Sequence, residues 1–421
     1  MNSIRSISST LKWSLPVQYS RRLSLHGRGT DTAYVSCDSN PATGAISPPI
    51  DLSTTFERDI NGEFSRGFNY SRLGNPTRCM FEKIFTELEF GKESLAFSSG
   101  MQAATALMLA MPKCHVLLPD DLYHGVYLVA KDLLSQWGMT MEKLDMTNHN
   151  LVKKRLEYTA ELDNTRPVLL WLETPSNPQC KVSDIASLVS MARNALCDRV
   201  VVAVDSTWAS PYLLNPLCLG ADVVMHSLTK YVAGHSDVLG GVLTAGDTPA
   251  ASTLLPRLRL THQLGGGVLS AWDSWMAMRG VRTLPVRMRQ HCAGASAVAA
   301  AMNSHPCVEL VHYPGLPSHP QHDLATKQMR GYGGMLSLLV RPACETSNGS
   351  MEALKVVRNV QLFKRATSLG GTESLIEHRR SVEGAYPVSP PNLLRISVGL
   401  EDPGDLIDDL SQSLFASATT L

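Results

Sequence analysis

The chain has 421 residues, too many for one small hydrophobic core, and this length suits one large domain with one or two smaller parts. Its 38 Lys and Arg residues balance its 38 Asp and Glu residues, so no net field would attract nucleic acid or an anionic membrane. The nine cysteines are scattered without a Cys-x-x-Cys pair, which argues against metal and redox sites, and no apolar stretch is long enough to span a bilayer.

The first 28 residues differ in composition from the rest. They contain five Lys or Arg residues and seven serines, and no acidic residue precedes Asp31. This composition predicts an organelle transit peptide, for mitochondria in the first place and for plastids as an alternative. A disordered extension that is never cleaved would instead leave the protein in the cytoplasm. Residues 29–80 follow, and within them Asn40–Thr77 is rich in Pro, Gly and Ser, which predicts an extended N-terminal arm.

From Ser94 onward, seven short apolar runs alternate with helical stretches. Several runs are continuously apolar, as in strands covered on both faces, and the intervening segments Gln102–Ala110 and Ile185–Ala195 have the period of surface helices. This alternation predicts a large α/β domain over residues 81–280 with a mainly parallel seven-stranded sheet. The predicted strands are Ser94–Phe97, His115–Leu118, Thr140–Leu144, Pro167–Leu172, Val200–Val204, Asp222–Met225 and Gly241–Thr244.

Residues 281–421 have a different pattern, which predicts a smaller C-terminal α+β domain. A long Ala-rich helix is expected over Leu284–Ser304. A closing helix is expected after Asp402-Pro403, an acidic N-cap followed by proline. Between them we expect strands at Val308–His312, Gly334–Val340 and Leu393–Val398 and a helix at Met351–Val357.

Polar residues stand at the carboxyl ends of several predicted strands, where ligands collect in open α/β sheets. After the first strand, Ser98-Ser99-Gly100-Met101 leads into a helix, so free backbone N–H groups and a positive dipole end would converge as a seat for phosphate. Such sequences also cap many helices that bind nothing, so the motif is weak by itself.

Two further strand ends make the pattern more specific. Asp205 ends one strand and could face a pyridine nitrogen, although helix capping is a commoner role for such an acid. The next strand ends in Ser227, Thr229 and Lys230, which offer hydroxyls for phosphate and an amine for a Schiff base. A lysine whose stem covers apolar surface is the alternative. The three ends together indicate a site for pyridoxal-5′-phosphate (PLP).

These residues resemble the Cys/Met-metabolism family of PLP enzymes. That family contains cystathionine γ-synthase, the cystathionine γ- and β-lyases, methionine γ-lyase and the O-acylhomoserine sulfhydrylases. The resemblance covers residues 30–420 and is most specific around Lys230. The matching runs are Tyr70–Thr77, Ser98–Met101, Glu173–Pro178, Asp205 with Thr207, His226–Tyr231, Gly234–Asp237, Ser368–Gly371 and Arg395–Glu401.

The resemblance implies the fold of aspartate-aminotransferase-like PLP enzymes (fold type I) and a role for each matching residue. Lys230 would carry the cofactor and shuttle protons, Asp205 would pair with the pyridinium nitrogen, and Tyr123 would stack on the ring and assist proton transfer. The implied cofactor contacts further include Ser99, Gly100, Met101, Thr207, Ser227 and Thr229, and the implied substrate contacts are Asn177, Ser368 and Arg395. Arg395 would clamp the substrate α-carboxylate as a bidentate fork.

Tyr70 and Arg72 resemble the arm residues that this family lends to the phosphate site of a neighbouring subunit. The resemblance therefore implies a homo-oligomer with a dimer as its minimum unit, and a dimer of dimers as the full assembly. Small amino acids would be the substrates, and neither a metal ion, nor nucleic acid, nor a membrane is expected as a partner.

The chain departs from the family pattern on the substrate side. Gly125 stands where methionine γ-lyases carry cysteine, which argues against that activity. Leu128 falls near a substrate-side arginine of many relatives, and Thr367 replaces a glutamate of several γ-enzymes. Other departures are Ser206 with Trp208, and the stretch Glu377-His378-Arg379-Arg380. These departures do not affect the inferred PLP site, but they leave the identity of the substrate undetermined.

The predicted activity is trans-sulfuration, with γ-replacement or with β- or γ-elimination on cystathionine or homoserine-derived amino acids. Cystathionine γ-synthase and γ-lyase chemistry come first, and cystathionine β-lyase and O-acylhomoserine sulfhydrylase are the alternatives. An aminotransferase would also use a strand-end aspartate and a Schiff-base lysine, and a non-catalytic PLP protein is a further possibility.

Overall fold

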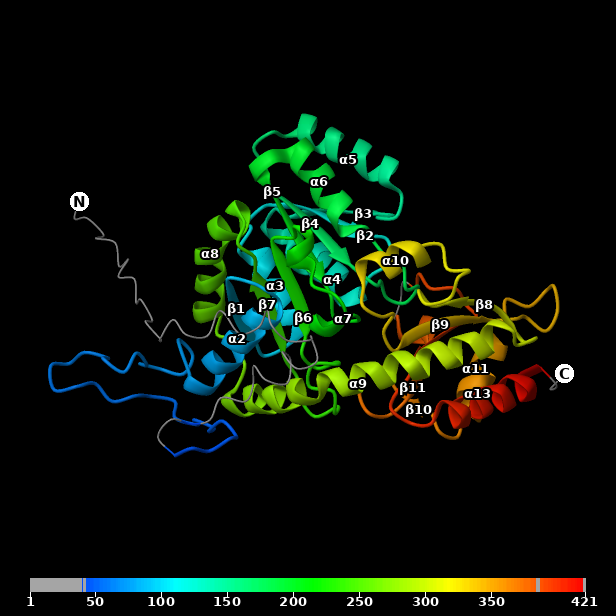
Figure 1. The fold of residues 1–421 in the computed structure, drawn as a ribbon. Helices are drawn as coiled ribbons and strands as arrows, with labels where there is room; N and C mark the ends of the chain where they lie inside the picture. The colour runs from blue at the N-terminus through cyan, green and yellow to red at the C-terminus, as the bar shows by residue number, and fades with distance from the viewer. Residues whose placement is uncertain (1–39, 41–42, 384–386, 419–421) are drawn as a thin grey trace.

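The computed structural model describes residue 40, residues 43–383 and residues 387–418. The predicted transit peptide, residues 1–28, lies outside the described residues. Two sheets, each with its own helices, follow one another along the chain (Figure 1). The larger sheet has seven strands and the smaller has five.

The seven-stranded sheet has the order β1-β7-β6-β5-β4-β2-β3. All neighbours from β6 to β3 are parallel, whereas β7 runs antiparallel to both β1 and β6. The predicted mainly parallel α/β sheet is thus confirmed. Its strands are β1 (Glu93–Phe97), β2 (His115–Pro119), β3 (Thr140–Leu144), β4 (Val168–Glu173), β5 (Val200–Asp205), β6 (Val223–Ser227) and β7 (Gly241–Ala245).

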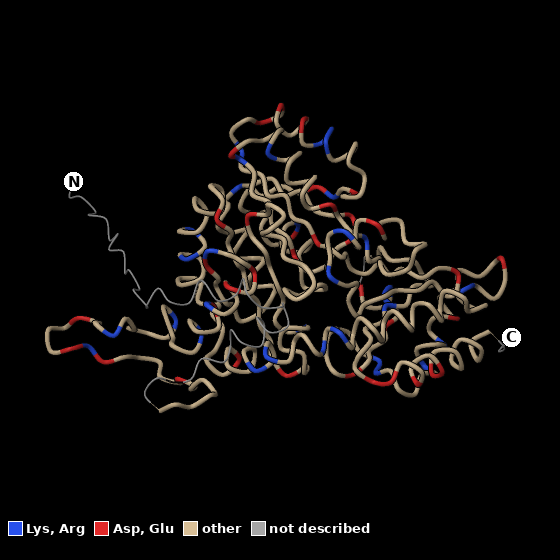
Figure 2. The backbone as a smooth tube through the Cα atoms, viewed as in Figure 1, with Lys and Arg blue, Asp and Glu red and all other residues tan. Residues whose placement is uncertain are grey.

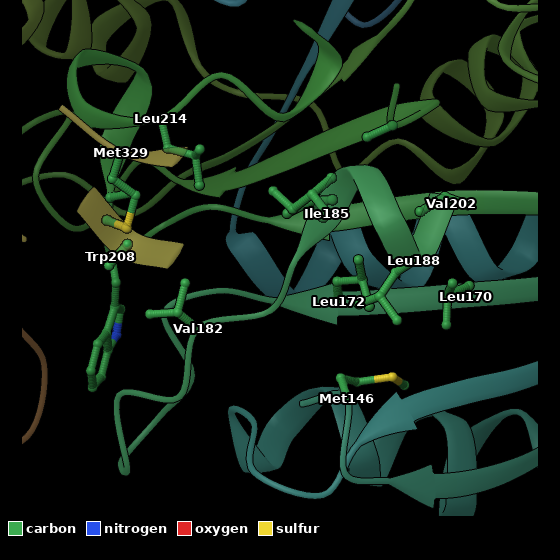
Figure 3. Close-up of a cluster of buried hydrophobic side chains, with 14 of the residues drawn as sticks. Met146, Leu170, Leu172, Val182, Ile185, Leu188, Val202, Trp208, Leu214 and Met329 are labelled. Atoms are coloured by element: carbon green, nitrogen blue, oxygen red, sulfur yellow. The ribbon is translucent and has the colours of Figure 1, made fainter. Parts of the chain in front are cut away.

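Alternate residues of β4 enter two different cores, because successive side chains of a strand point to opposite faces of the sheet. Leu170 and Leu172 pack with Ile185 and Leu188 of α6 (Figure 3), whereas Trp171 packs in the core that contains α3. Both faces of the sheet are therefore covered, which explains the continuously apolar strands. The helices of this part are α2 (Pro76–Leu88), α3 (Gly100–Leu109), α4 (His124–Leu128), α5 (His149–Leu162), α6 (Ile185–Leu196), α7 (Ser210–Leu213) and α8 (Pro249–Gly265).

The five-stranded sheet has the order β10-β11-β12-β9-β8, and only its β10–β11 pair is parallel. Residues of α9, α11 and α13 share one core with this sheet, so the predicted α+β domain is confirmed. Its elements are α9 (Ala271–Asn303), β8 (Val308–His312), α10 (His322–Gln328), β9 (Met335–Val340), α11 (Ser350–Asn359), β10 (Lys364–Arg365), β11 (Leu375–His378), α12 (Arg379–Val382), β12 (Leu393–Ser397) and α13 (Pro403–Ala418).

Helix α9 is longer than the predicted Leu284–Ser304, because it begins at Ala271 and runs along both sheets (Figure 1). It packs tightly on the chain segment that follows Lys230. A Cβ atom on Gly280 would lie 2.5 Å from the carbonyl oxygens of both Val232 and Ala233. Arg287 donates from Nη1 to the carbonyl oxygen of Tyr231 at 2.6 Å. The helix that joins the two sheets therefore also supports the segment carrying the lysine.

The predicted arm precedes α2, whose first turn is capped by the side chain of Asn75. Part of the arm forms a long excursion away from both sheets (Figure 1). Ile46, Leu52 and Ile60 of the arm are at least two-thirds exposed. Within a single subunit, the arm therefore leaves these apolar side chains in contact with solvent.

Lys and Arg residues are interspersed with Asp and Glu residues over both parts of the molecule (Figure 2). None of the helices in the described ranges is long and apolar enough to cross a membrane. Within these same ranges, no group of three or more His, Cys, Asp and Glu residues is placed to hold a metal ion.

Candidate active site

Lys230 lies just beyond the carboxyl end of β6, between the two sheets. Its Nζ donates a hydrogen bond to Ser368 Oγ at 2.6 Å, and Ser368 belongs to the loop before β11. Burial, followed by the positive charge of Arg395, lowers the pKa of Lys230 to about 8. A lysine of this kind supplies neutral amine close to neutral pH, as both Schiff-base formation and proton transfer require.

Asp205 ends β5, the strand beside β6, and its side chain is buried. Its Oδ1 accepts two hydrogen bonds from Thr207, from the backbone N at 2.9 Å and from Oγ1 at 2.5 Å. Burial raises the pKa of Asp205, and these hydrogen bonds oppose that effect. The carboxylate is thus fixed in place and lacks a cationic partner at ion-pair distance among the described side chains, as suits an acid that receives a pyridinium.

Glu173 forms a second buried carboxyl group beside Asp205, because β4 and β5 pair in parallel with these two residues in register. Burial, and then the negative charge of Asp205, raises the pKa of Glu173 well above its usual range. Glu173 Oε2 accepts from the backbone N of Tyr123 at 2.8 Å. It therefore positions the start of α4, a role that the sequence pattern did not indicate.

The predicted phosphate seat is formed where α3 begins. Ser99 caps this helix by accepting from Gln102 N at 3.0 Å. A Cβ atom on Gly100 would lie 3.1 Å from Ser227 Cβ, so glycine lets the start of the helix approach the Ser227 hydroxyl closely. Thr207 Oγ1 accepts from Ser227 N at 2.9 Å, which ties this seat to Asp205.

The predicted phosphate ligand Thr229 is hydrogen-bonded to the backbone of Gly240. Its hydroxyl donates to Gly240 O at 3.3 Å and accepts from Gly240 N at 3.2 Å. These bonds join Thr229 to the residue that precedes β7. The hydroxyls of Ser227 and Thr229 both remain predicted ligands of the phosphate.

Tyr123 precedes α4 and has 44% of its surface exposed. A Cβ atom on Gly125 would lie 2.7 Å from the Tyr123 ring and 2.8 Å from Met101 Sδ. Tyr123 is thus adjacent to Met101, the second residue of the phosphate-seat helix. A cysteine at position 125 would displace this ring or Met101, which agrees with the expectation that Gly125 disfavours methionine γ-lyase chemistry.

Arg395 lies in the centre of β12 and is buried, so its charge requires an anionic partner. That partner is Glu377 of β11, the cross-strand neighbour, whose Oε1 lies 3.0 Å from Arg395 Nη2. Arg395 also donates to Asn177 Oδ1 at 3.2 Å and to Ser368 O at 3.1 Å. Burial lowers the pKa of Arg395 to about 10, and the charge of Glu377 opposes this effect.

The structure therefore brings together most of the predicted residues at the junction of the two domains, with Ser368 linking the Lys230 amine to the Arg395 guanidinium. Tyr70 and Arg72 lie elsewhere in the same subunit. Arg72 donates from Nη1 to Gln263 O at 2.7 Å and lies over the ring of Tyr70, with 5.6 Å from its Cζ to the ring centroid.

Comparison with known proteins agrees with this arrangement. The model of the Cys/Met metabolism PLP-dependent enzyme family matches residues 30–415. The chain belongs to this family. It is 40% identical over 395 residues to the cystathionine γ-synthase of Mycobacterium leprae, covering 92% of this chain and 97% of that one. It is 38% identical over 385 residues to the cystathionine β-lyase of Coxiella burnetii, covering 89% and 94%.

A crystal structure of metB from Corynebacterium glutamicum superimposes with a TM-score of 0.84 at 35% identity, covering 93% of this chain and 99% of that one. The predicted PLP-transferase fold is thus confirmed, as are PLP as the cofactor and membership of the trans-sulfuration enzymes. The site residues fit the cofactor because the start of α3 reaches Ser227, a buried acid ends β5, and Lys230 offers an amine of lowered pKa.

Substitution of Thr207 tests whether Asp205 and the phosphate seat at Ser227 depend on the same side chain for PLP binding. We expect Thr207→Val to raise the dissociation constant of PLP about 10- to 100-fold, because both Asp205 and Ser227 N lose a hydrogen bond. Titration of the apoenzyme with PLP, followed by visible absorbance, measures this constant. Thr207→Ser keeps the hydroxyl and should bind PLP as the wild type does. Equal affinity of Thr207→Val and the wild type would contradict the link.

Proposed function

We propose that this enzyme acts at the γ-carbon of cystathionine or a homoserine ester, as cystathionine γ-synthase or γ-lyase does. The connection of the Lys230 amine and the Arg395 guanidinium through a single residue, Ser368, supports a reaction at the Cα of an α-amino acid. The observation that carries the choice of the γ-carbon is the 40% identity to a cystathionine γ-synthase. An α-amino acid whose carboxylate binds Arg395 would present its Cα and Cβ hydrogens near Lys230. Both hydrogens must be removed in γ-chemistry, whereas β-elimination requires removal of only the first.

Arg395 would bind the substrate α-carboxylate as a fork of two N–H donors. Asn177 and the Ser368 carbonyl group hold the guanidinium from the large and the small domain, respectively. The guanidinium that would orient the carboxylate is thus held by groups from both domains. The favourable geometry is prepared before the substrate binds, which reduces the entropic cost of reaching the transition state.

Lys230 would transfer the protons. With PLP bound, the cofactor accepts the electrons that remain on the substrate when the Cα proton leaves. The lowered pKa of about 8 provides a substantial neutral fraction of the free Lys230 amine at mildly alkaline pH. The Ser368 hydroxyl, 2.6 Å away, holds this amine on the side of the site that faces Arg395.

Tyr123 would protonate the departing group. Its ring lies beside Met101 and is partly exposed, so a γ-substituent that extends toward it could receive its proton. In elimination the Cγ–S bond breaks, the sulfur leaves with a proton, and water releases 2-oxobutyrate and ammonia. In replacement, the thiol of a second substrate adds at Cγ after the first group has left, and its proton returns to the enzyme.

A β-lyase activity is the second candidate, because the β-lyase of Coxiella burnetii is nearly as similar to this chain as the γ-synthase is. Thr367 precedes Ser368 in place of the glutamate of several γ-enzymes, and its side chain is exposed. The surroundings of the sulfur-bearing end of the substrate therefore differ from those in such γ-enzymes.

The purified enzyme should convert cystathionine to 2-oxobutyrate, or form cystathionine from cysteine and an O-acylhomoserine. Assays for 2-oxobutyrate, pyruvate and cystathionine in the same reaction distinguish the possibilities. Lys230→Ala should reduce turnover about 10²- to 10⁴-fold, because it removes the base. Pyruvate with homocysteine as the main products would replace the proposal by β-lyase activity, and conversion of the cofactor to its pyridoxamine form would indicate an aminotransferase.

We also propose that Tyr70 and Arg72 complete the phosphate site of a second subunit, in a dimer or a dimer of dimers. The arm that carries them includes a segment that extends away from both sheets (Figure 1). Its Ile46, Leu52 and Ile60 side chains are at least two-thirds exposed. Arg72→Ala and Lys230→Ala variants, each inactive alone, should regain activity when co-expressed. Random pairing in a twofold dimer leaves about a quarter of the sites intact. Mixed oligomers that stay inactive would contradict shared sites.

We propose that residues 1–28 direct the protein to mitochondria. Their basic, acid-free composition supports this, and the family match begins only at residue 30. Residues 1–28 fused to a fluorescent protein should colocalise with a mitochondrial stain, whereas a fusion in which the five basic residues are changed to glutamine should not. Plastid or diffuse fluorescence of the unchanged fusion would contradict the proposed mitochondrial location.

A further inference from the structure

A glutamate of this chain, Glu377, would compete with the substrate α-carboxylate for Arg395. Glu377 Oε1 lies 3.0 Å from Arg395 Nη2, and both side chains are only 5% exposed. The two residues are direct cross-strand neighbours in the β11–β12 pair, so they share one face of the small sheet. A substrate α-carboxylate must therefore bind to a guanidinium whose charge a buried glutamate already balances.

The neighbouring Arg379 holds this glutamate. Arg379 Nη1 donates a hydrogen bond to the same Glu377 Oε1 at 3.0 Å. Arg395 and Glu377 form an ion pair at an equal distance without a hydrogen bond between them in the described structure. The directional interaction of Glu377 is thus with Arg379. Glu377 Oε2 is buried and has no hydrogen-bond partner in the same region.

Arg379 is itself anchored from its other side. Its Nε lies 3.4 Å from Glu383 Oε1. Glu383 in turn accepts hydrogen bonds from Val388 N at 2.8 Å and from Ser389 N at 2.9 Å. Burial raises the pKa of Glu383, but these bonds and Arg379 outweigh it and lower the pKa overall, so Glu383 remains a firm anionic support.

We propose that Arg379 is a positioning residue that retains Glu377 and so reserves Arg395 for the substrate α-carboxylate. When the carboxylate binds, Glu377 yields Arg395 without becoming an unpaired buried anion, because Arg379 still binds it. An unpaired charge in such a place would be costly. The free Oε2 atom also allows Glu377 to accept both prongs of the Arg379 fork at that moment. This role rests on the proposed carboxylate clamp and adds the device that keeps the clamp available.

The inference predicts a defect that appears only for ligands with a carboxylate. Without Arg379, Glu377 would turn fully to Arg395 and compete with the ligand. In Arg379→Gln holoenzyme we expect the dissociation constant of L-alanine to rise about 10- to 100-fold. L-alaninamide has the same amine and side chain but a neutral amide, so its affinity should change little. Titration followed by the visible absorbance of the cofactor measures both constants.

Removing the competitor should reverse the defect. In the double variant Glu377→Gln/Arg379→Gln, the L-alanine constant should return to within about threefold of the wild-type value, a strong non-additivity that marks interacting residues. Arg380→Gln is the matched control, since Arg380 is exposed and donates to Ser389 O at 3.0 Å rather than to Glu377. It should bind L-alanine as the wild type does.

Three outcomes would overturn the role. Equal losses for L-alanine and L-alaninamide in Arg379→Gln would show a general structural defect. A double variant no better than Arg379→Gln would show that Glu377 is not a competitor. Weakened binding of cystathionine with unchanged L-alanine would show that Arg379 contacts a distant part of the substrate. Normal titrations without trans-sulfuration products would instead refute the proposed function and leave this inference standing.

Discussion

Pairing of buried charges at the junction between the two sheets is the constraint on which this site depends. An ion moved from water into a protein interior costs several kcal/mol unless partners compensate it. Arg395 meets this requirement through Glu377, and Glu377 through Arg379. Asp205 is different, because its described partners are neutral hydrogen-bond donors. These buried charges of the small domain are thus paired with one another. The large domain instead has a buried acid, Asp205, that a cationic cofactor ring can neutralise.

The large sheet could be predicted from the sequence because burial on both faces demands apolar residues at every position. β4 and β5 are buried throughout, and their runs of Val, Leu and Ala show it. β11 escaped prediction for the opposite reason. Its four residues, Leu375–His378, are all buried, yet half of them are ionisable, and their burial depends on partners in other strands. The early start of α9 was missed because Gly280 and Pro285 interrupt a helical pattern, although packing on Val232 and Ala233 requires the glycine.

In the candidate site, too, some residues could be placed from the sequence and others could not. Lys230, Asp205 and the start of α3 could be placed together because parallel strands end at a common edge, which is a property of local sequence and of topology. The roles of Glu377 and Arg379 depend on strand register, and the engagement of Thr229 with Gly240 depends on a neighbouring strand. Contacts of this kind are set by tertiary structure and leave no pattern in the sequence. Glu377 and Arg379 also belong to a stretch that departs from the family pattern, so substrate choice was the least predictable property.

The conformation of Ser368 explains why the cofactor-binding residues do not determine whether the enzyme carries out β- or γ-chemistry. The Ser368 backbone has a φ of +92°, which is rare for a residue other than glycine and costs about 1–3 kcal/mol. The adjacent loop is locked in place, since a Cβ atom on Gly370 would lie 2.7 Å from Tyr231 N. The distance between the Lys230 amine and the carboxylate clamp is therefore fixed by the fold and would serve β- and γ-reactions alike. Selection between them must come from groups that meet the far end of the substrate. Gly125, Leu128 and Thr367 are candidates because the chain departs from the pattern of its relatives at these positions.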